Sequence, residues 1–273
     1  WIYWAIQLVL AAVFVYSMAF RKYTPEFINK KAIMFIGAVY FVCIAYSSVI
    51  CIVVKIISVI SGKISPNSRV TKVLKGRKIL PIITLCCTVL LGVAGYINMG
   101  ILREKDISVE IDKESVNDSI TAVMISDTHL GTGLYADQMD ELVDKINGME
   151  PDVIFMVGDI IDEWTSEQDK ELMAKEFSRL NSKYGTYFAF GNHELFTIDQ
   201  KVTQYFEEAG ITVLRDEVSV IADDITVIGR MDHHENPEPA EEIIKRNNID
   251  ISKPVIVLTH EPLELEELSL IHI

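Results

Sequence analysis

Six side chains with metal-binding or proton-transfer chemistry follow four short apolar runs in the second part of the chain. They are Asp127 and His129, then Asp159, then Asn192 and His193, and finally His260. A cluster of carboxylate, amide and imidazole donors suits Mn²⁺, Fe or Zn²⁺, rather than a thiolate site or an all-oxygen calcium site. A carboxylate such as Asp159 can bridge two ions, and two ions about 3.5–4 Å apart can hold both oxygens of an in-line displacement and acidify a bridging water.

The apolar runs before these side chains are predicted to be strands of an α/β fold. Strands are expected at residues 107–111, 120–126, 153–157, 186–190, 211–214, 225–228 and 255–258, and helices at 134–149, 167–183, 199–209 and 238–247. This alternation predicts a sheet with crossover helices, whose active site lies beyond the carboxyl ends of the strands. In a largely parallel sheet the four polar ends would meet at one edge, and glycines before Asp159 and Asn192 would permit tight turns there.

Taken in order, these motifs resemble the calcineurin-like metallophosphoesterase family. The pattern is D-x-H, G-D, G-N-H-[DE] and a strand that ends in His, and it covers residues 119 to about 262. It is carried by the stretches VMISDTHLG, PDVIFMVGDIID and YGTYFAFGNHE. The resemblance implies an αββα sandwich that performs metal-assisted hydrolysis of phosphomonoesters or phosphodiesters.

The resemblance also implies a ligand role for each matching residue. Asp127 and His129 are expected to bind the first metal ion, and Asp159 to bridge both ions. Asn192 and His260 are expected to bind the second ion. The cofactors would therefore be two divalent ions of Mn, Fe or Zn.

Further residues are assigned around these ligands. His193 is expected to contact the phosphate or to protonate the leaving oxygen as a general acid. Glu194 stands where the family usually has Asp and is expected to orient His193, while Asp162 is expected to support the ligands from behind. Arg230 is expected to touch the substrate. The neighbouring pair His233-His234 lies among turn-forming residues and is interpreted as part of a solvated loop.

The two ends of the sequence suggest a fragment. The family pattern closes with Gly-His-x-His, which this sequence does not contain, and the chain begins with Trp1 rather than Met. Residues 268–273 can be read from the transposase end sequence used to build sequencing libraries. We interpret these six residues as adapter-derived and expect the domain to be incomplete at its C-terminus.

Charge and hydropathy divide the chain near residue 102. Residues 1–102 carry 11 Lys or Arg and one acid, for a net charge of +10, whereas residues 103–273 carry 14 Lys or Arg and 38 acids, for a net charge of −24. Apolar runs at residues 1–20, 33–60 and 79–102 are each long enough to span a bilayer. We therefore predict about three transmembrane helices in residues 1–102 and a metallophosphoesterase domain in residues 103–273.

The predicted location is a membrane, with a multi-pass anchor and the plasma membrane as its setting. The basic loops on the two faces are nearly balanced, so the positive-inside rule does not fix the side of the domain. These loops could hold anionic lipid headgroups or simply set the topology. The acidic domain repels polyanions, which disfavours nucleic acid. A lipid-linked phosphoester or a soluble nucleotide remains as substrate, and the alternative is a non-catalytic membrane sensor or scaffold that retains the fold.

Overall fold

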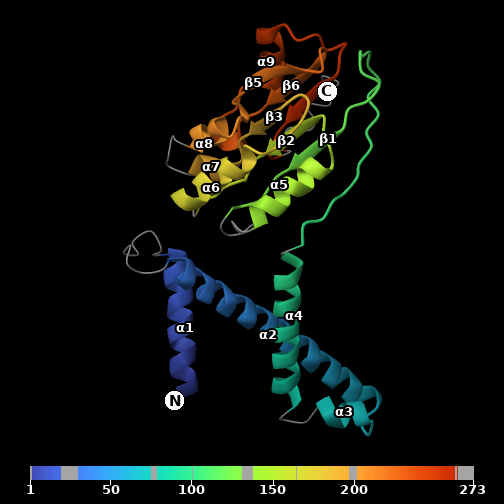
Figure 1. The fold of residues 1–273 in the computed structure, drawn as a ribbon. Helices are drawn as coiled ribbons and strands as arrows, with labels where there is room; N and C mark the ends of the chain where they lie inside the picture. The colour runs from blue at the N-terminus through green and yellow to red at the C-terminus, as the bar shows by residue number, and fades with distance from the viewer. Residues whose placement is uncertain are drawn as a thin grey trace. The chain divides into compact units, whose positions relative to one another are not determined.

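The computed structural model describes residues 2–19, 30–74, 79–99, 101–130, 138–163, 165–196, 202–261 and 263. The chain divides into two compact units, Trp1–Ile101 and Leu102–Ile273 (Figure 1). Residues 268–273, which carry the expectation of an adapter-derived end, lie outside the described residues.

The N-terminal unit is helical and apolar. Its helices are α1 (Ile2–Ala19), α2 (Lys30–Ile64), α3 (Arg69–Leu74) and α4 (Ile79–Met99). Among the described residues, only Phe35–Ile64 is both long and apolar enough to cross a membrane, and its most apolar 18-residue window contains no buried residue. Ala5–Ala19 and Pro81–Gly95 are shorter apolar stretches. The prediction of three spanning helices is therefore supported for one of them.

Small and hydroxyl-bearing side chains join these helices. Tyr40 donates a hydrogen bond to the backbone oxygen of Gln7 at 3.2 Å, and Ser47 and Thr88 share another at 3.2 Å. Gly37 allows α1 and α2 to approach closely, because a Cβ there would lie 2.5 Å from the Ser17 hydroxyl oxygen. Such contacts are typical of helices that pack against one another in lipid.

The C-terminal unit contains two sheets. The first holds four parallel strands in the order β1 (Ala122–Ile125), β2 (Val153–Val157), β3 (Thr186–Ala189) and β4 (Thr212–Leu214). In the second, β6 (Ile225–Gly229) pairs antiparallel with β5 (Glu217–Ile221) and parallel with β7 (Val255–Leu258). Six of the seven predicted strands are confirmed, β2 and β7 with the predicted ends and the other four with shifted ends. The expectation that all four motif strands share one sheet was wrong, because β7 belongs to the second sheet.

One predicted strand is absent from the described residues, and one observed strand was not predicted. Residues 107–111, which the structure describes, form no regular secondary structure, and Ile107 and Val109 remain 69% and 74% exposed. This segment is held instead by side-chain contacts farther along, where Ser115 donates to Asp224 at 3.0 Å and Asn117 donates to the Ala222 carbonyl at 2.7 Å. Strand β5 was not predicted, although it pairs with β6 across the short turn that contains Ala222 and Asp224.

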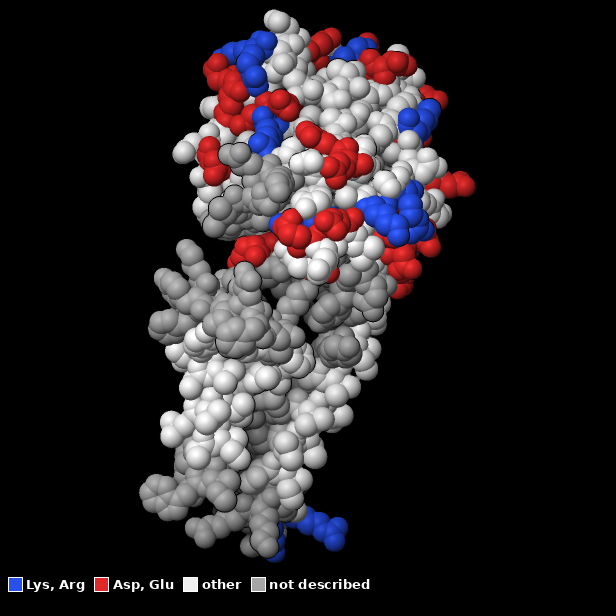
Figure 2. All heavy atoms as spheres, turned by 60° about the vertical axis from the view of Figure 1, so that its left-hand side comes forward, with Lys and Arg blue, Asp and Glu red and all other residues white. Residues whose placement is uncertain are grey.

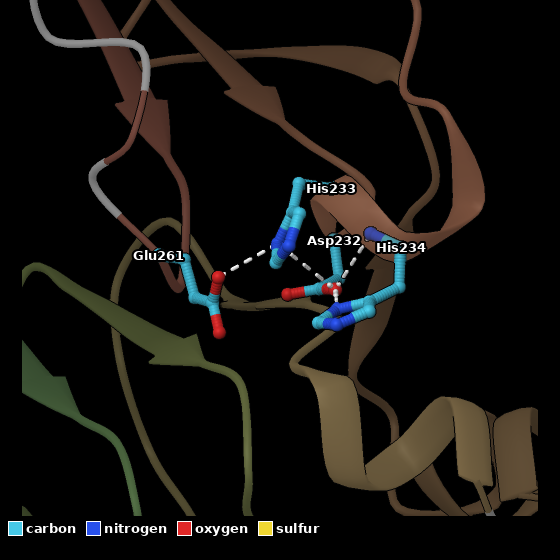
Figure 3. A group of neighbouring side chains, drawn as sticks. All are labelled: Asp232, His233, His234 and Glu261. Carbon is cyan, nitrogen blue, oxygen red and sulfur yellow. Dashed lines mark hydrogen bonds and ion pairs between the residues drawn. The ribbon is translucent and has the colours of Figure 1, made fainter.

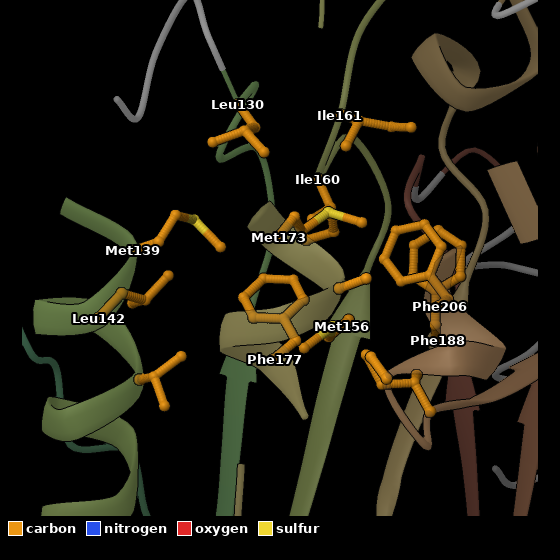
Figure 4. Close-up of a cluster of buried hydrophobic side chains, with 14 of the residues drawn as sticks. Leu130, Met139, Leu142, Met156, Ile160, Ile161, Met173, Phe177, Phe188 and Phe206 are labelled. Atoms are coloured by element: carbon orange, nitrogen blue, oxygen red, sulfur yellow. The ribbon is translucent and has the colours of Figure 1, made fainter. Parts of the chain in front are cut away.

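One face of the first sheet is covered by helices α5 (Met139–Gly148), α6 (Glu167–Phe177) and α8 (Val202–Glu208). Figure 4 shows Met173 and Phe177 of α6 packed above Met156 of β2, while Phe188 of β3 stacks on Phe206 of α8 with ring centroids 4.0 Å apart. These helices are shorter than predicted. Two of the predicted helices begin at residues 134 and 199, in the stretches 131–137 and 197–201, which lie outside the described residues.

The other face of the first sheet packs on the second sheet. Phe155 and Tyr187 from the first sheet meet Val227 and Leu258 from the second in one continuous buried cluster. Helix α9 (Ala240–Asn247) then covers the outer face of the second sheet through Ile243. The layers are therefore helix, sheet, sheet and helix, which confirms the predicted αββα sandwich.

The surfaces of the two units differ in charge. On the face shown in Figure 2, Asp and Glu side chains are spread over the globular unit, while the described surface of the helical unit is largely uncharged. The acidic surface of the globular unit agrees with the net charge of −24 for residues 103–273.

Candidate active site

The loops after β1 and β2 run side by side at the carboxyl ends of these strands. Asp127 donates its backbone N–H to the Gly158 carbonyl at 3.1 Å, and His129 donates to the Asp159 carbonyl at 3.0 Å. The parallel pairing of the two strands is therefore continued into their loops, so three predicted ligands lie on adjacent backbone. We call the site formed around this carboxylate the Asp159 site.

Three of the predicted ligands have a left-handed backbone conformation. The φ angles are 55° at Asp127, 42° at His129 and 55° at Asp159. Residues other than glycine seldom adopt this region, which costs roughly 1–2 kcal/mol each. Strain of this kind gathers at functional sites, where the surrounding structure holds it in place.

Two glycines make room for the site. A Cβ on Gly158, where φ is 73°, would lie 2.6 Å from the His260 ring, and one on Gly191 would lie 2.3 Å from Asp159 Oδ1. Neither position can therefore accept a larger residue without displacing a predicted ligand. The expectation that these glycines permit a close approach of backbone and ligands is confirmed.

The Asp159 carboxylate lies at the centre of the predicted ligands and is only 3% exposed. Its Oδ2 is 3.2 Å from His260 Nε2 and 3.6 Å from His129 Nε2, and its Oδ1 accepts a hydrogen bond from the His193 backbone N–H at 2.9 Å. Asp159 thus belongs to two groups whose ligand atoms lie within 4.8 Å of one another. One group contains His129 and His193, and the other contains Asp127 and His260.

This grouping differs from the expected assignment, which paired Asp127 with His129. Asn192 begins helix α7 (Asn192–Phe196), a helix that was not predicted, and its two chain neighbours, Gly191 and His193, lie against Asp159. The structure therefore brings the motifs together while grouping their side chains differently.

His260 reaches the site from the second sheet. Its Nδ1 donates to the Val157 carbonyl at 2.9 Å, which leaves Nε2 directed at Asp159 and 3.9 Å from Asp127 Oδ1. A backbone carbonyl that fixes the tautomer of a histidine in this way is typical of metal ligands. The lone pair of Nε2 is thereby presented to the carboxylates when the ring is neutral.

The pKa values of His260 and Asp159 shift in opposite directions, because the two side chains are hydrogen-bonded to each other. The hydrogen bond to Asp159 raises the pKa of His260 to about 9. Burial raises the pKa of Asp159, but the hydrogen bonds from His260 and from the His193 backbone outweigh burial and leave that pKa below its usual range. In the absence of a cation, the proton on His260 therefore balances part of the charge of the buried carboxylate.

His193 is oriented by a residue that was not predicted. Its Nδ1 lies 2.9 Å from Glu163 Oε2, and its ring meets the His129 ring edge-on at a centroid distance of 4.7 Å. Glu163 follows directly after the GDIID stretch. The sequence shows Glu163 only as an acid beside Asp162. It does not show that the loop after β2 approaches the loop that carries His193.

Glu194 contacts backbone rather than the His193 ring. This buried carboxylate, 3% exposed, accepts hydrogen bonds at 2.7–3.1 Å from four backbone N–H groups, those of Asp159, Ile160, Ile161 and Gly191. Burial raises its pKa, and the hydrogen bonds from Ile161, Asp159 and Gly191 oppose that rise. Glu194 therefore fixes the two turns that carry Asp159 and Asn192. The carboxylate that contacts the His193 ring is that of Glu163, not that of Glu194 as expected.

Asp162 and Arg230 are both buried. The Asp162 backbone N–H donates to the Thr165 hydroxyl oxygen at 3.0 Å, and that hydroxyl donates to the Leu130 carbonyl at 2.7 Å, so this network joins the loop after β2 to the loop that carries His129. Arg230 is 1% exposed, and its Nε lies 3.6 Å from Asp216 Oδ1. In this conformation its guanidinium is not accessible to a phosphate, in contrast to the expected contact with substrate.

Comparison with known proteins agrees with this arrangement. The family model of calcineurin-like phosphoesterases matches residues 120–270, which include all of the predicted ligands. The chain belongs to this family.

Its curated metallophosphoesterase relatives include bacterial and animal proteins. An uncharacterized metallophosphoesterase of Campylobacter jejuni is 28% identical over 57% of this chain and 42% of its own length. One from Aquifex aeolicus is 28% identical over 64% of this chain and 67% of its own length. A transmembrane protein with metallophosphoesterase domain from Danio rerio is 28% identical over 74% of this chain and 49% of its own length. The chain thus spans less than half of the Campylobacter and Danio proteins.

Metallophosphoesterases use divalent metal ions, and the residues present fit such ions. The ligand atoms converge from three loops and a fourth strand end, and they include a buried carboxylate common to both groups. Imidazole nitrogens and carboxylate oxygens together are suited to Mn²⁺, Fe and Zn²⁺. His260 is already held in the tautomer that offers Nε2.

Proposed function

We propose that this chain hydrolyses phosphomonoester or phosphodiester bonds at a two-metal site. The proposed ligands are Asp127, His129, Asp159, Asn192 and His260. The observation that carries the proposal is that the buried Asp159 carboxylate lies between two proposed ligands, with Oδ2 3.6 Å from His129 Nε2 and 3.2 Å from His260 Nε2. A carboxylate in that position is the natural bridge between two cations a few ångströms apart.

Divalent cations, when bound, would supply positive charge for the phosphoryl oxygens and lower the pKa of a coordinated water. The protein holds their ligands in a fixed arrangement. The left-handed backbone at Asp127, His129 and Asp159, together with the two glycines, leaves few other conformations for these loops. Such a site needs little reorganisation during the reaction.

His193 is proposed as the general acid for the leaving oxygen. Because Nδ1 is engaged by Glu163 at 2.9 Å, the proton available for transfer is the one on Nε2. Glu163 would hold the ring in place, as a carboxylate behind a catalytic histidine does. Glu163 is therefore a positioning residue rather than a catalytic one.

The charge of the domain narrows the substrate class. Residues 103–273 carry a net charge of −24, which disfavours polyanions and leaves small or lipid-linked phosphoesters. Membrane attachment would bring the site close to lipid-linked substrates. Stretch 35–64 could span the bilayer, and the match to the Danio protein is longer than the globular unit of this chain alone. We propose a multi-pass anchor in which α1 and α4 also cross the membrane.

The deciding experiment measures Mn²⁺-dependent hydrolysis of p-nitrophenyl phosphate and bis-p-nitrophenyl phosphate by the full-length protein in detergent. The control is an Asn192→Ala, His193→Ala double variant. Turnover that requires Mn²⁺ and disappears in the variant supports the proposal. Cation binding without turnover on either substrate would contradict it and favour a membrane sensor that retains the fold.

A further inference from the structure

A second group of metal-ligating side chains lies outside the Asp159 site. Figure 3 shows His233 and His234, from the 3₁₀ turn η3 (His233–Glu235), gathered with Asp232 and Glu261. We call this group the Asp232 cluster. Its ligand atoms lie within 4.8 Å of one another, and it shares no residue with the two groups around Asp159.

Both imidazoles direct Nδ1 at carboxylates. His234 Nδ1 lies 2.7 Å from Asp232 Oδ1, and His233 Nδ1 lies 3.6 Å from the same oxygen and 2.6 Å from Glu261 Oε2. The rings are close, with centroids 3.8 Å apart. The sequence pattern predicted a solvated loop, and both imidazoles are exposed, but the loop also brings their ligand atoms within 4.8 Å of those of Asp232 and Glu261.

The second oxygen of Asp232 gives independent support for a bound cation. Asp232 is 3% exposed, and its Oδ2 is buried without a hydrogen bond to any residue that the structure describes. In Figure 3 this oxygen points toward the space between His233 and Glu261. A buried carboxylate oxygen without a donor costs about 1–3 kcal/mol or more, and a cation bound there would remove that cost.

The composition of the cluster specifies the kind of cation. Two neutral imidazoles and two carboxylates balance the charge of a divalent ion and provide four donors. Four nitrogen and oxygen donors without thiolates suit Zn²⁺ in tetrahedral coordination, whereas Ca²⁺ and Mg²⁺ prefer all-oxygen shells.

We propose that the Asp232 cluster is a third metal site of this protein and that it binds one Zn²⁺ or a similar divalent transition-metal ion. Such an ion would join the loop after β6 to the end of β7, because Glu261 comes from the latter and the other three ligands from the former. Glu261 directly follows His260. The ion would therefore hold in place the strand end that carries a ligand of the Asp159 site.

The test counts bound Zn²⁺ per full-length chain in detergent, by competition with a chromophoric chelator and by elemental analysis. A His233→Gln, His234→Gln double variant should bind one equivalent less than the wild type. An Asp127→Asn, His129→Gln variant, which disrupts the Asp159 site, should retain that equivalent. Glu261→Gln should weaken its binding about tenfold. Co²⁺ in the Asp127→Asn, His129→Gln variant should show a visible absorption band of tetrahedral type.

Two outcomes would overturn the proposal. One is an unchanged number of equivalents in the His233→Gln, His234→Gln variant. The other is the loss of all tightly bound Zn²⁺ in the Asp127→Asn, His129→Gln variant. The two imidazoles are 40% and 47% exposed, so the first variant should fold, and circular dichroism with thermal unfolding would verify this.

Discussion

The Asp159 site and the Asp232 cluster are built in opposite ways from the same kinds of side chain. At the Asp159 site, left-handed backbone, two glycines and the buried Glu194 hold the ligands. In the Asp232 cluster, two half-exposed imidazoles project from one short turn toward Asp232. The first arrangement is fixed before a cation arrives, and the second can adjust to one. Substitutions behind the ligands should therefore be costly at the Asp159 site, whereas changes to the imidazoles of the Asp232 cluster should be tolerated.

The largest effect is expected from Glu194→Gln. An amide offers only one acceptor oxygen, so two of the four backbone N–H groups would lose their acceptor and face an NH₂ group. The free energy of unfolding should fall by roughly 2–6 kcal/mol, because each buried donor left without a partner costs about 1–3 kcal/mol. Chemical denaturation would measure this, with the exposed Glu207→Gln as control. Equal stability of the two variants would show that the turns are not held by Glu194.

Gly191→Ala should come next, with a loss in kcat/KM of about 100-fold. The new Cβ would lie 2.3 Å from Asp159 Oδ1 and 2.6 Å from its backbone nitrogen, so the carboxylate must move, and a shift of about 1 Å in a catalytic group has this cost. Gly148→Ala is the matched control, since nothing lies within 4 Å of its added Cβ. Similar kinetics in the two variants would argue against a fixed site.

Glu163→Gln should lower kcat about 10- to 100-fold with little change in KM, because it removes the carboxylate that positions His193 without removing a cation ligand. Glu163→Asp should recover part of the loss. Steady-state kinetics with saturating Mn²⁺ would measure both. A change confined to KM would indicate that Glu163 binds substrate instead.

Cation binding at the Asp159 site should depend strongly on pH. His260, with a pKa of about 9, must lose its proton to become a ligand, so affinity at the Asp159 site should increase up to tenfold per pH unit until about pH 9. Without a cation, the raised pKa of His260 stabilises the fold fully below pH 6.5, and this contribution is lost as pH rises through 9. Calorimetry in buffers of different ionisation enthalpy would count the released proton, which should be absent in His260→Asn.

The smallest effect on turnover is expected from His233→Gln with His234→Gln. Neither side chain belongs to the groups around Asp159, and the Val157 carbonyl holds the His260 ring even without an ion on Glu261, so kcat/KM at saturating Mn²⁺ should stay within about twofold of the wild type. The same kinetic assay measures it. A loss as large as that of Gly191→Ala would show that the two groups act as one site.

Much of the Asp159 site could be predicted from the sequence because it depends on local patterns. A strand followed by Asp or Gly-Asp places a ligand at a strand end, whichever sheet contains the strand. The sheet to which β7 belongs could not be predicted, because pairing is decided by contacts between distant segments. The same limit hid the contact between Glu163 and His193, 30 residues apart, and the convergence of Glu261 with His233.

The route by which His260 reaches the site has a consequence for the order of assembly. Its ring is held by the carbonyl of Val157, 103 residues earlier in the chain, so this contact closes a long loop and depends on the docking of β7 beside β6. Long-range pairings of this kind form late in folding. Full cation affinity at the Asp159 site therefore arises only once β7 has paired with β6. Tight metal binding would thus report that the second sheet has folded.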